Sequence, residues 1–300
     1  MGITESIIQT ANENLFLLKK AILDEGFFDF EMDEGEITEE EIMNMSYSEF
    51  YKLCISDYIE ILYHGSHKTD GFTHVLIAWR YCEDGLHPKS INDEEEDDDE
   101  MCFSDDSPSM LHLRVYSRKD GEENFCLSAV INGWVFLYGC AHSDWYNYYS
   151  EIDGWSALSC EGFSILSSIY LLFSDDYNEF DDFERPFIIL DDIKVEEEYR
   201  GHGLLTYMLD FLEGYYGEDF IGVANNSDMT QEEAMCGTFE ELADKIGWTP
   251  IKEFPHDTTP DDIKFAVHIP SEDKYRISYV GNINLFAIFM APYCMPEYFK

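Results

Sequence analysis

The sequence predicts a mixed α/β (α+β) fold of 300 residues, with helices packed on a sheet. Three observations support this prediction. Residues 1–63 carry apolar side chains at helical spacing, and residues 111–140 show strand patterns around a hairpin signal. Residues 188–212 change from a β-branched run to a helical pattern through two glycines. At this length the chain has room for one enlarged domain or two small ones.

The N-terminal part contains two amphipathic stretches, at 7–22 and 47–63. We expect both to be helices that pack on the domain's own sheet, with binding of a partner as the alternative. Between them, residues 31–41 are acidic, and we expect them to be exposed.

His64 and His67 have a spacing that could place two imidazoles on one metal ion. No second ligand pair stands at a fitting distance, so a surface turn is the preferred interpretation and no metal site is predicted. The acidic run at 91–100 (INDEEEDDDE) is expected to be a solvated loop. Neither this run nor residues 175–182 has the residue order of a calcium-binding helix–loop–helix site.

Strand patterns dominate the middle of the chain. Residues 73–81 (THVLIAWRY) are expected to form the first strand of the sheet, and residues 111–116 alternate between apolar and polar. Residues 125–131 and 134–140 flank Asn132-Gly133, a dipeptide typical of a two-residue hairpin turn. The strands expected to complete the sheet are 263–269 and 275–291.

Two segments allow more than one interpretation. Residues 142–149 are polar and aromatic, and they could form the wall of an acceptor site or pack on the edge of the domain. Residues 162–173 are apolar and could form a helix or a buried strand. No Gly-x-Ser-x-Gly sequence is present, so the chain offers no support for a serine hydrolase of the nucleophile-elbow type.

The segment 188–212 reads as a strand, a turn and a helix in succession. Its β-branched run predicts the strand, Glu196-Glu197-Glu198 a charged elbow, and leucines at helical spacing the helix. Gly201 and Gly203 stand on either side of His202 where the helix starts. Backbone N–H groups are left uncovered there, at the positive end of the helix dipole, and such a turn can bind a phosphate without many cations.

The order of these residues resembles motif A of the GNAT acyl-CoA N-acyltransferases, whose signature after the fourth strand is Arg/Gln-x-x-Gly-x-Gly/Ala. Arg200 and Gly203 match this signature, together with the intervening Gly201. Leu205 stands where the family has Gly or Ala, and its bulkier side chain could crowd a bound pyrophosphate.

The residues that follow are similar to the next part of the same family. Residues 220–224 read as the fifth strand, Asn225 as its exit, and residues 239–246 as a helix. Lys245-Ile246-Gly247-Trp248 looks like the family's ending of that helix. Ala243 stands where the family often has a tyrosine that acts as general acid.

The resemblance covers residues 187–251. It implies a GNAT-like central sheet, mixed but mostly antiparallel and flanked by helices, in an acyltransferase domain over residues 105–300. Residues 1–104 would then be an acidic, mainly helical N-terminal extension that includes the acidic loop at 91–100.

The resemblance also implies acetyl-CoA as co-substrate and direct transfer from its thioester to an amine. The backbone donors from Gly201 to Leu205 would bind the pyrophosphate, with help from Arg200 and His202. The strand edge Ile193–Val195 would hydrogen-bond the pantetheine arm. The cofactor-binding residues expected on this basis are Ile193, Lys194, Val195, Arg200, Gly201, His202, Gly203, Leu204 and Leu205.

An amine acceptor with a pKa of about 10 must lose a proton before it attacks, and a carboxylate can assist directly or through water. Asp191 and Asp192 are adjacent acids in an apolar strand, and their side chains point to opposite faces. Either could be the base, and a carboxylate exposed at a strand end is the alternative. Asn225 could orient the thioester, with water protonating the thiolate; we name no general acid.

The formal net charge of −45 restricts the partners of this chain. We do not expect this chain to bind nucleic acid directly, because its sequence contains no basic stripe. Three interpretations stay open. The surface could be salt-adapted, although Lys outnumbers Arg by 12 to 6. It could steer cationic substrates such as polyamines or basic proteins, or it could imitate nucleic-acid phosphates toward a DNA-binding protein.

The eight cysteines are scattered singly, and the N-terminal MGITESIIQT has neither a basic start nor a long apolar run. We therefore expect reduced thiols, no signal peptide, no membrane span and a cytoplasmic location. The function expected from the resemblance is acetyl-CoA-dependent N-acetyl transfer to a cationic amine. The alternative is a non-enzymatic acidic decoy that imitates DNA, built on a degenerate GNAT scaffold.

Overall fold

We describe the fold from a computed structural model of the chain. The residues that the structure describes are 3–26, 37–69, 71–82, 108–137, 186–217, 220–225, 241, 243–244, 246–250 and 265–268. The predictions for residues 91–100, 142–149, 162–173 and 275–291 lie outside these residues.

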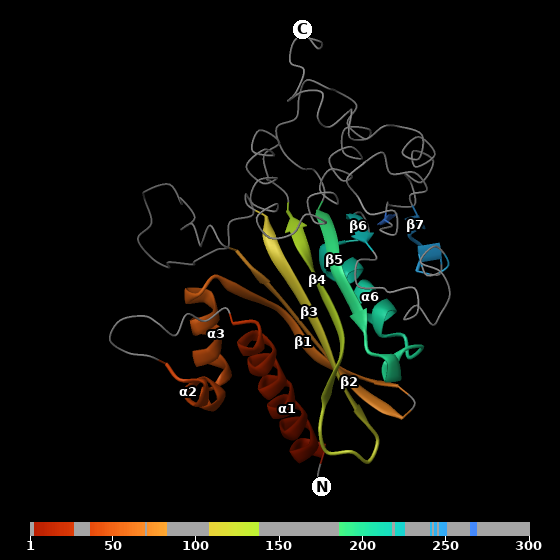
Figure 1. Cartoon of the computed structure of the whole chain (residues 1–300). Helices are drawn as coiled ribbons and strands as arrows, with labels where there is room; N and C mark the ends of the chain where they lie inside the picture. Colours follow the sequence, from red (N-terminus) through yellow and green to blue (C-terminus); the bar gives the residue numbers. More distant parts are fainter. Residues whose placement is uncertain are drawn as a thin grey trace, which may run out of the picture. The chain divides into compact units, whose positions relative to one another are not determined.

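The fold is mixed α/β, and its eight described strands form one open, mostly antiparallel sheet in the order β1-β2-β3-β4-β5-β6-β8-β7 (Figure 1). The pair β5–β6 is parallel, whereas β1–β2, β6–β8 and β7–β8 are antiparallel. The chain divides into two compact units. Unit 1 comprises Met1–Ser104 and Leu111–Val130, and unit 2 comprises Asp105–Met110 and Ile131–Lys300.

Unit 1 begins with three helices and two long strands. They are α1 (Ile3–Asp24), α2 (Glu39–Asn44), α3 (Tyr47–Ser56), β1 (Ile59–Thr69) and β2 (Phe72–Tyr81). Among the helices of the described residues, none combines the length and the apolar character needed to cross a membrane.

Both short helices start at a capping box. The Thr38 hydroxyl accepts a hydrogen bond from the Glu41 amide at 3.2 Å, and the Glu41 carboxylate accepts one from the Thr38 amide at 2.8 Å. Ser46 and Glu49 repeat this arrangement at the start of α3. Each box satisfies two amides that a helix start leaves without intrahelical partners, which fixes where these short helices begin.

The core of unit 1 forms where the apolar face of α1 meets one face of the sheet. Leu18 and Ile22 of α1 pack with Phe50 of α3 and with Ile77 and Trp79 of β2. All five side chains are fully buried. Burial of each such side chain contributes about 1.5–3 kcal/mol to the stability of the folded state. The amphipathic pattern predicted for residues 7–22 therefore stabilises unit 1 through this packing.

Lys19 is buried within this core although it carries an amine. Its Nζ donates hydrogen bonds to the carbonyl oxygens of Met43, at 3.0 Å, and Met45, both at the end of α2. Burial lowers the pKa of Lys19, and the nearby Glu49 carboxylate opposes that effect. The side chain therefore ties α1 to the C-terminal end of α2.

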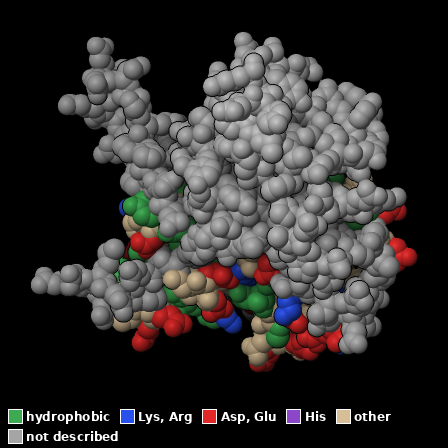
Figure 2. Space-filling view, turned by 45° about the horizontal axis from the view of Figure 1, so that its top comes forward, with side chains coloured by type: hydrophobic (Ala, Val, Ile, Leu, Met, Phe, Trp, Pro, Cys, Tyr) green, Lys and Arg blue, Asp and Glu red, His purple; other side chains and the backbone are tan. Residues whose placement is uncertain are grey.

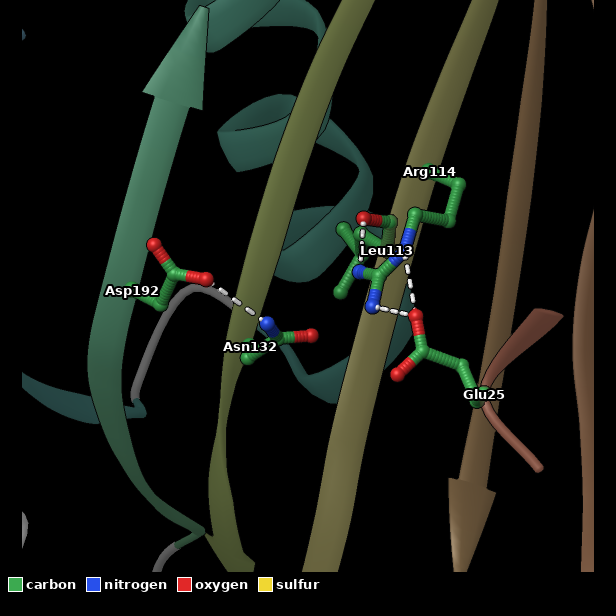
Figure 3. A network of polar contacts seen from close by, with 5 residues as sticks. All are labelled: Glu25, Leu113, Arg114, Asn132 and Asp192. Carbon is green, nitrogen blue, oxygen red and sulfur yellow. Dashed lines mark hydrogen bonds and ion pairs between the residues drawn. The ribbon is translucent and has the colours of Figure 1, made fainter. Parts of the chain in front are cut away.

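Arginines on the sheet of unit 1 pair with glutamates. Arg114 of β3 donates to Glu25 from Nε at 3.1 Å and also from Nη2, and its Nη1 donates to the Leu113 carbonyl at 2.9 Å (Figure 3). The Arg114 guanidinium also lies 5.4 Å from the centre of the Trp79 ring. Two further pairs of the same kind join Arg118 to Glu13 and Arg80 to Glu60.

Strands β3 (Ser109–Lys119) and β4 (Cys126–Phe136) correct the predicted hairpin. The strand predicted at 111–116 is confirmed, but Asn132-Gly133 lies inside β4 rather than in a turn. The chain reverses before β4, where Gly121 has a φ of +91° and the Glu122 amide donates to the Lys119 carbonyl at 3.0 Å. Gly133 serves a different purpose, because a Cβ there would overlap the carbonyl oxygen of Ile189.

Two further predictions in unit 1 are corrected. The helix expected over 47–63 ends at Ser56, and β1 begins at Ile59 after Tyr58, which adopts a φ of +61°. The strand predicted at 73–81 is confirmed as β2, but β1 comes before it. The region 1–104 therefore contributes two long strands as well as helices.

Unit 2 contains the elements that surround the predicted site. They are β5 (Phe187–Val195), the 3₁₀ turn η2 (Glu197–Tyr199), α6 (Leu204–Tyr216), β6 (Ile221–Asn225), β7 (Thr249–Pro250) and β8 (Phe265–His268). The predicted strand, charged elbow, glycine turn and helix are confirmed, and so are the strands predicted around 220–224 and 263–269.

Candidate functional site

The candidate site is built on the turn between β5 and α6. Gly201 and Gly203 have φ values of +80° and +78°, which a residue with a Cβ adopts only at a cost. Gly203 is the N-cap of α6 and, as a glycine, has no side chain that could cap the amides of the first helical turn. These amides therefore form a patch of backbone donors at the positive end of a 13-residue helix.

The space next to both glycines is open. Both residues are exposed, and no described atom lies within 4 Å of the position that a Cβ would take at either one. His202 between them is exposed as well. An anion can therefore approach the backbone of this turn from solvent, which is the arrangement that phosphate groups use at helix starts.

Arg200 is held at the end of β5. Its side chain is half-buried, and its Nε donates a 3.0 Å hydrogen bond to the Val195 carbonyl. This bond fixes the guanidinium beside the glycine turn, so its positive charge can act on an anion bound there.

The charge around the turn is mixed. Lys194 pairs with Glu196 at 3.0 Å, but both side chains are about half exposed, so the pair contributes little to stability. Glu196, Glu197 and Glu198 are all exposed. Acidic side chains also form much of the described surface that is visible in Figure 2. An anionic ligand must therefore rely on the backbone donors and the cations of the turn itself.

Helix α6 begins with two adjacent leucines that differ in burial. Leu204 is buried and, with Met208, Leu209, Leu212 and Tyr216, forms the face on which the helix packs. Leu205, at the position where a small residue was expected, is only half-buried. The helix start is thus anchored through Leu204, while Leu205 remains beside the donor patch.

Strand β5 continues beyond its pairing with β6. The parallel register runs from Phe187 opposite Ile221 to Leu190 opposite Ala224, and β5 then extends to Val195. On this extension Ile193 and Val195 are half-buried and Lys194 is exposed. Beyond the described pairing, the extension is a stretch of strand that can hydrogen-bond an extended ligand arm, as an exposed strand edge does with a peptide.

Asp191 and Asp192 open this extension, and both are half-buried. Asp192 Oδ2 accepts a 2.8 Å hydrogen bond from Asn132 Nδ2 of β4, and Figure 3 shows the two side chains directed toward each other. The alternation of side chains along β5 directs Asp191 to the opposite face. Asn132 was assigned to a turn, so this interaction was missed; the sequence signal that could have found it is a polar residue within an apolar run.

Asn225 lies close to the two aspartates in the register of the sheet. It ends β6 directly after Ala224, as Asp191 directly follows Leu190, the partner of Ala224. Asn225 also pairs with Phe265 of β8. The structure therefore brings the backbone positions of Asp191 and Asn225 to the same level of neighbouring strands.

Trp248 packs against β6. A Cβ at Gly222 would lie 2.8 Å from the Trp248 ring, and Trp248 is almost fully buried. Gly247 has a φ of +79°, and the Trp248 amide donates to the Ala243 carbonyl at 2.8 Å. Ala243 itself is buried, and its methyl side chain offers no hydroxyl for acid catalysis.

No group of histidine, cysteine and acidic side chains that could hold a metal ion occurs within the described ranges. His64 and His67 both lie on β1, not in a surface turn. They are three residues apart on a strand, which directs their side chains to opposite faces.

Taken together, unit 2 supplies an open patch of backbone donors, a fixed arginine, a strand extension and a carboxylate held by an amide. This set can bind an anionic ligand with an extended arm and can accept a proton nearby. Comparison with protein-family models and with curated proteins found no match to the chain.

Proposed function

We propose that the protein is an acetyl-CoA-dependent N-acetyltransferase with a GNAT-like domain and an acidic N-terminal extension. One observation carries the proposal: a parallel strand pair, β5 and β6, is joined through α6, which starts at an open glycine turn with Gly203 as its N-cap. The match of Arg200, Gly201 and Gly203 to motif A supports the same interpretation.

In this proposal the cofactor is bound by the turn and by the strand extension. The amides from Gly201 to Leu205, with Arg200 and His202, bind the pyrophosphate. The backbone of Ile193–Val195 hydrogen-bonds the pantetheine arm. This binding positions the thioester next to the aspartates that open the extension and next to Asn225.

The acceptor is a cationic amine: a basic protein, a basic peptide or a polyamine. The charge of −45 attracts such substrates and increases their rate of encounter. Asp191 or Asp192 takes the proton of the ammonium group, directly or through water, and Asn225 orients the thioester. Ala243 leaves water to protonate the departing thiolate.

The proposed location is the cytoplasm, where thiols stay reduced. The structure is compatible with an inert role for Cys54, which is fully buried and whose thiol pKa is raised by that burial.

The proposal is tested by a transfer assay. The full-length protein is incubated with radiolabelled acetyl-CoA and either polylysine or spermidine, and the acetylated product is isolated and counted. We expect label in at least one amine and a fall in rate with rising salt, because screening weakens steering. If neither acceptor carries label at acetyl-CoA concentrations that saturate the protein, the proposed acceptor class is contradicted.

A second function is favoured by the charge distribution of unit 1. Arg80, Arg114 and Arg118 are each paired with a glutamate inside the unit, so they do little to offset the acidic surface. That surface could occupy a DNA-binding protein by imitating phosphates, without catalysis. This function predicts no thermal stabilisation by acetyl-CoA and formation of a salt-sensitive complex with a DNA-binding protein that DNA displaces.

A further inference from the structure

Helix α3 of unit 1 presents two tyrosines to solvent. Tyr47 and Tyr51 are one helical turn apart, and they are 43% and 39% exposed. The centres of their rings lie 6.0 Å apart, and the ring planes differ by 28°. The buried side of the same helix is formed by Phe50 and Cys54. The two tyrosine rings therefore offer a stacked aromatic surface outside the core of the unit.

His64 of β1 extends this surface, and we call Tyr47, Tyr51 and His64 the aromatic patch. The centre of the His64 ring lies 5.4 Å from that of Tyr47, so the patch joins α3 to β1. His64 is half-buried, and burial lowers its pKa. The imidazole therefore stays neutral at neutral pH and adds no positive charge to the patch.

The charged residues of the two short helices are mostly acidic. Helices α2 and α3 are joined by Met45 and Ser46 alone. Their charged side chains are all exposed, and they are Glu39, Glu40, Glu41, Glu49 and Lys52. Glu49, which lies between the two tyrosines in the sequence, has a pKa lowered by hydrogen bonds from the Ser46 hydroxyl and amide, so it is ionised at neutral pH. This local excess of carboxylates has the sign of the net charge of −45 and favours a cationic partner.

Stacked tyrosines and nearby carboxylates together fit one class of partner. The face of a tyrosine ring attracts a cation, and a planar guanidinium can also stack on the ring. The carboxylates attract the same cation from a distance. The acidic charge repels an anionic partner, and a purely apolar partner gains nothing from it. Arginine side chains use both features of this surface.

We propose that the aromatic patch binds an arginine-rich segment of a partner protein, with guanidinium groups stacked on Tyr47 and Tyr51. This inference goes beyond the acetyl transfer proposed above and does not depend on it, because the patch belongs to unit 1 and the glycine turn to unit 2. The carboxylates of α2 and α3 increase the rate of encounter with the segment, and the rings determine where its arginines bind.

The test measures binding of a short peptide of alternating arginine and glycine to the full chain by calorimetry. A salt concentration of about 0.3 M screens the attraction of the acidic surface in general. Tyr47→Leu/Tyr51→Leu keeps an apolar surface without rings, and Tyr47→Phe/Tyr51→Phe keeps the rings. Neither variant changes the net charge, and leucine is a good helix former, so α3 should persist. Circular dichroism and thermal unfolding verify that both variants are folded.

We expect the double leucine variant to bind the peptide about tenfold more weakly than wild type, because two exposed cation–π contacts are lost. The double phenylalanine variant should stay within about twofold of wild type, since phenylalanine presents a similar ring face. Phe16→Leu is the control: it removes a ring of α1 that is 54% exposed and should leave the affinity unchanged.

Equal affinities of wild type and the double leucine variant would overturn the inference, as would an equal loss in Phe16→Leu, because the peptide would then bind without using the patch. Absence of binding to wild type would overturn it as well. A lysine–glycine peptide and spermine test the occupant. If either binds as tightly as the arginine peptide and loses as much affinity in the double leucine variant, the patch accepts cations in general and the assignment to an arginine-rich segment is wrong.

Discussion

A Cβ atom at Gly133 would overlap the carbonyl oxygen of Ile189 on the adjacent strand. This relationship explains why glycine occupies the middle of β4, where it otherwise weakens a strand. It also brings Asn132 within 2.8 Å of Asp192, so one dipeptide determines both the spacing of β4 and β5 and the orientation of a site carboxylate.

The first prediction is that Gly133→Ala destabilises the protein by about 1–3 kcal/mol, because backbone must move to admit the methyl group. Gly201→Ala is the matched control: it adds the same methyl group in open space at a φ of +80°. There the cost is the left-handed conformation alone, about 1–2 kcal/mol. Urea unfolding measures both. A Gly133→Ala protein as stable as wild type would contradict the close approach.

Local sequence patterns determine some parts of this fold, and contacts between distant residues determine others. Helix α6 and strand β5 were predictable because their apolar periodicities change at two glycines within a few residues. The hairpin at Asn132-Gly133 was predicted wrongly, because the dipeptide has the same sequence whether its glycine supplies a turn or a close contact. Only the position of Ile189, more than fifty residues later, distinguishes the two.

The helix predicted through Tyr63 was wrong for a related reason. Residues 59–63 carry a mostly apolar run that fits a helix or a strand. Their antiparallel pairing with β2, which continues past a register shift between Ile61 and Tyr63, decides the matter. For the site, the glycine turn and Arg200 could be found by spacing. The Asn132–Asp192 contact depends on neighbouring strands whose pairing no local pattern specifies.

The second prediction concerns the ion pair in unit 1. Glu25→Ala leaves the Arg114 guanidinium, whose side chain is 5% exposed, without its carboxylate partner. We expect a loss of about 2 kcal/mol, below the range for fully buried pairs because Glu25 is partly exposed. Glu196→Ala is the control, since its exposed pair with Lys194 contributes at most about 0.5 kcal/mol. Equal losses in thermal or urea unfolding would contradict the assigned role of Arg114.

The third prediction is a pH dependence from the cap of α3. Hydrogen bonds from the Ser46 hydroxyl, and then from its amide, lower the pKa of Glu49. Because the folded pKa lies below the unfolded one, ionised Glu49 stabilises the protein above the unfolded pKa, and this contribution is lost as pH falls through the folded pKa. The stability advantage of wild type over Glu49→Gln should therefore shrink on acidification, as measured by urea unfolding at a series of pH values.

Asp57 provides a control of opposite sign in that experiment. Burial raises its pKa, so its contribution to stability is fully present below the unfolded pKa and is lost as pH rises through the folded pKa. Wild type should accordingly gain stability relative to Asp57→Asn on acidification. The same slope for both variants would show that general charge repulsion, rather than these local contacts, governs the response.

The fourth prediction concerns the cation at the glycine turn. Arg200→Glu removes a donor held by the Val195 carbonyl and reverses its charge, so affinity for acetyl-CoA should fall about tenfold or more. The thermal stabilisation by a fixed concentration of acetyl-CoA should shrink accordingly. Lys119→Glu makes the same charge change at an exposed position at the end of β3 and should keep the shift. Equal thermal shifts in the two variants would show that Arg200 does not contribute to acetyl-CoA binding.

The most direct measurement is equilibrium dialysis of the full-length protein against radiolabelled acetyl-CoA. We expect saturable binding of one molecule per chain, displaced by unlabelled coenzyme A and weakened by Arg200→Glu. Cofactor concentrations up to about 1 mM cover the range in which enzymes bind their substrates. No retention of label by the wild-type protein over that range would contradict the claim that the amides around Gly201 and Gly203 bind a pyrophosphate.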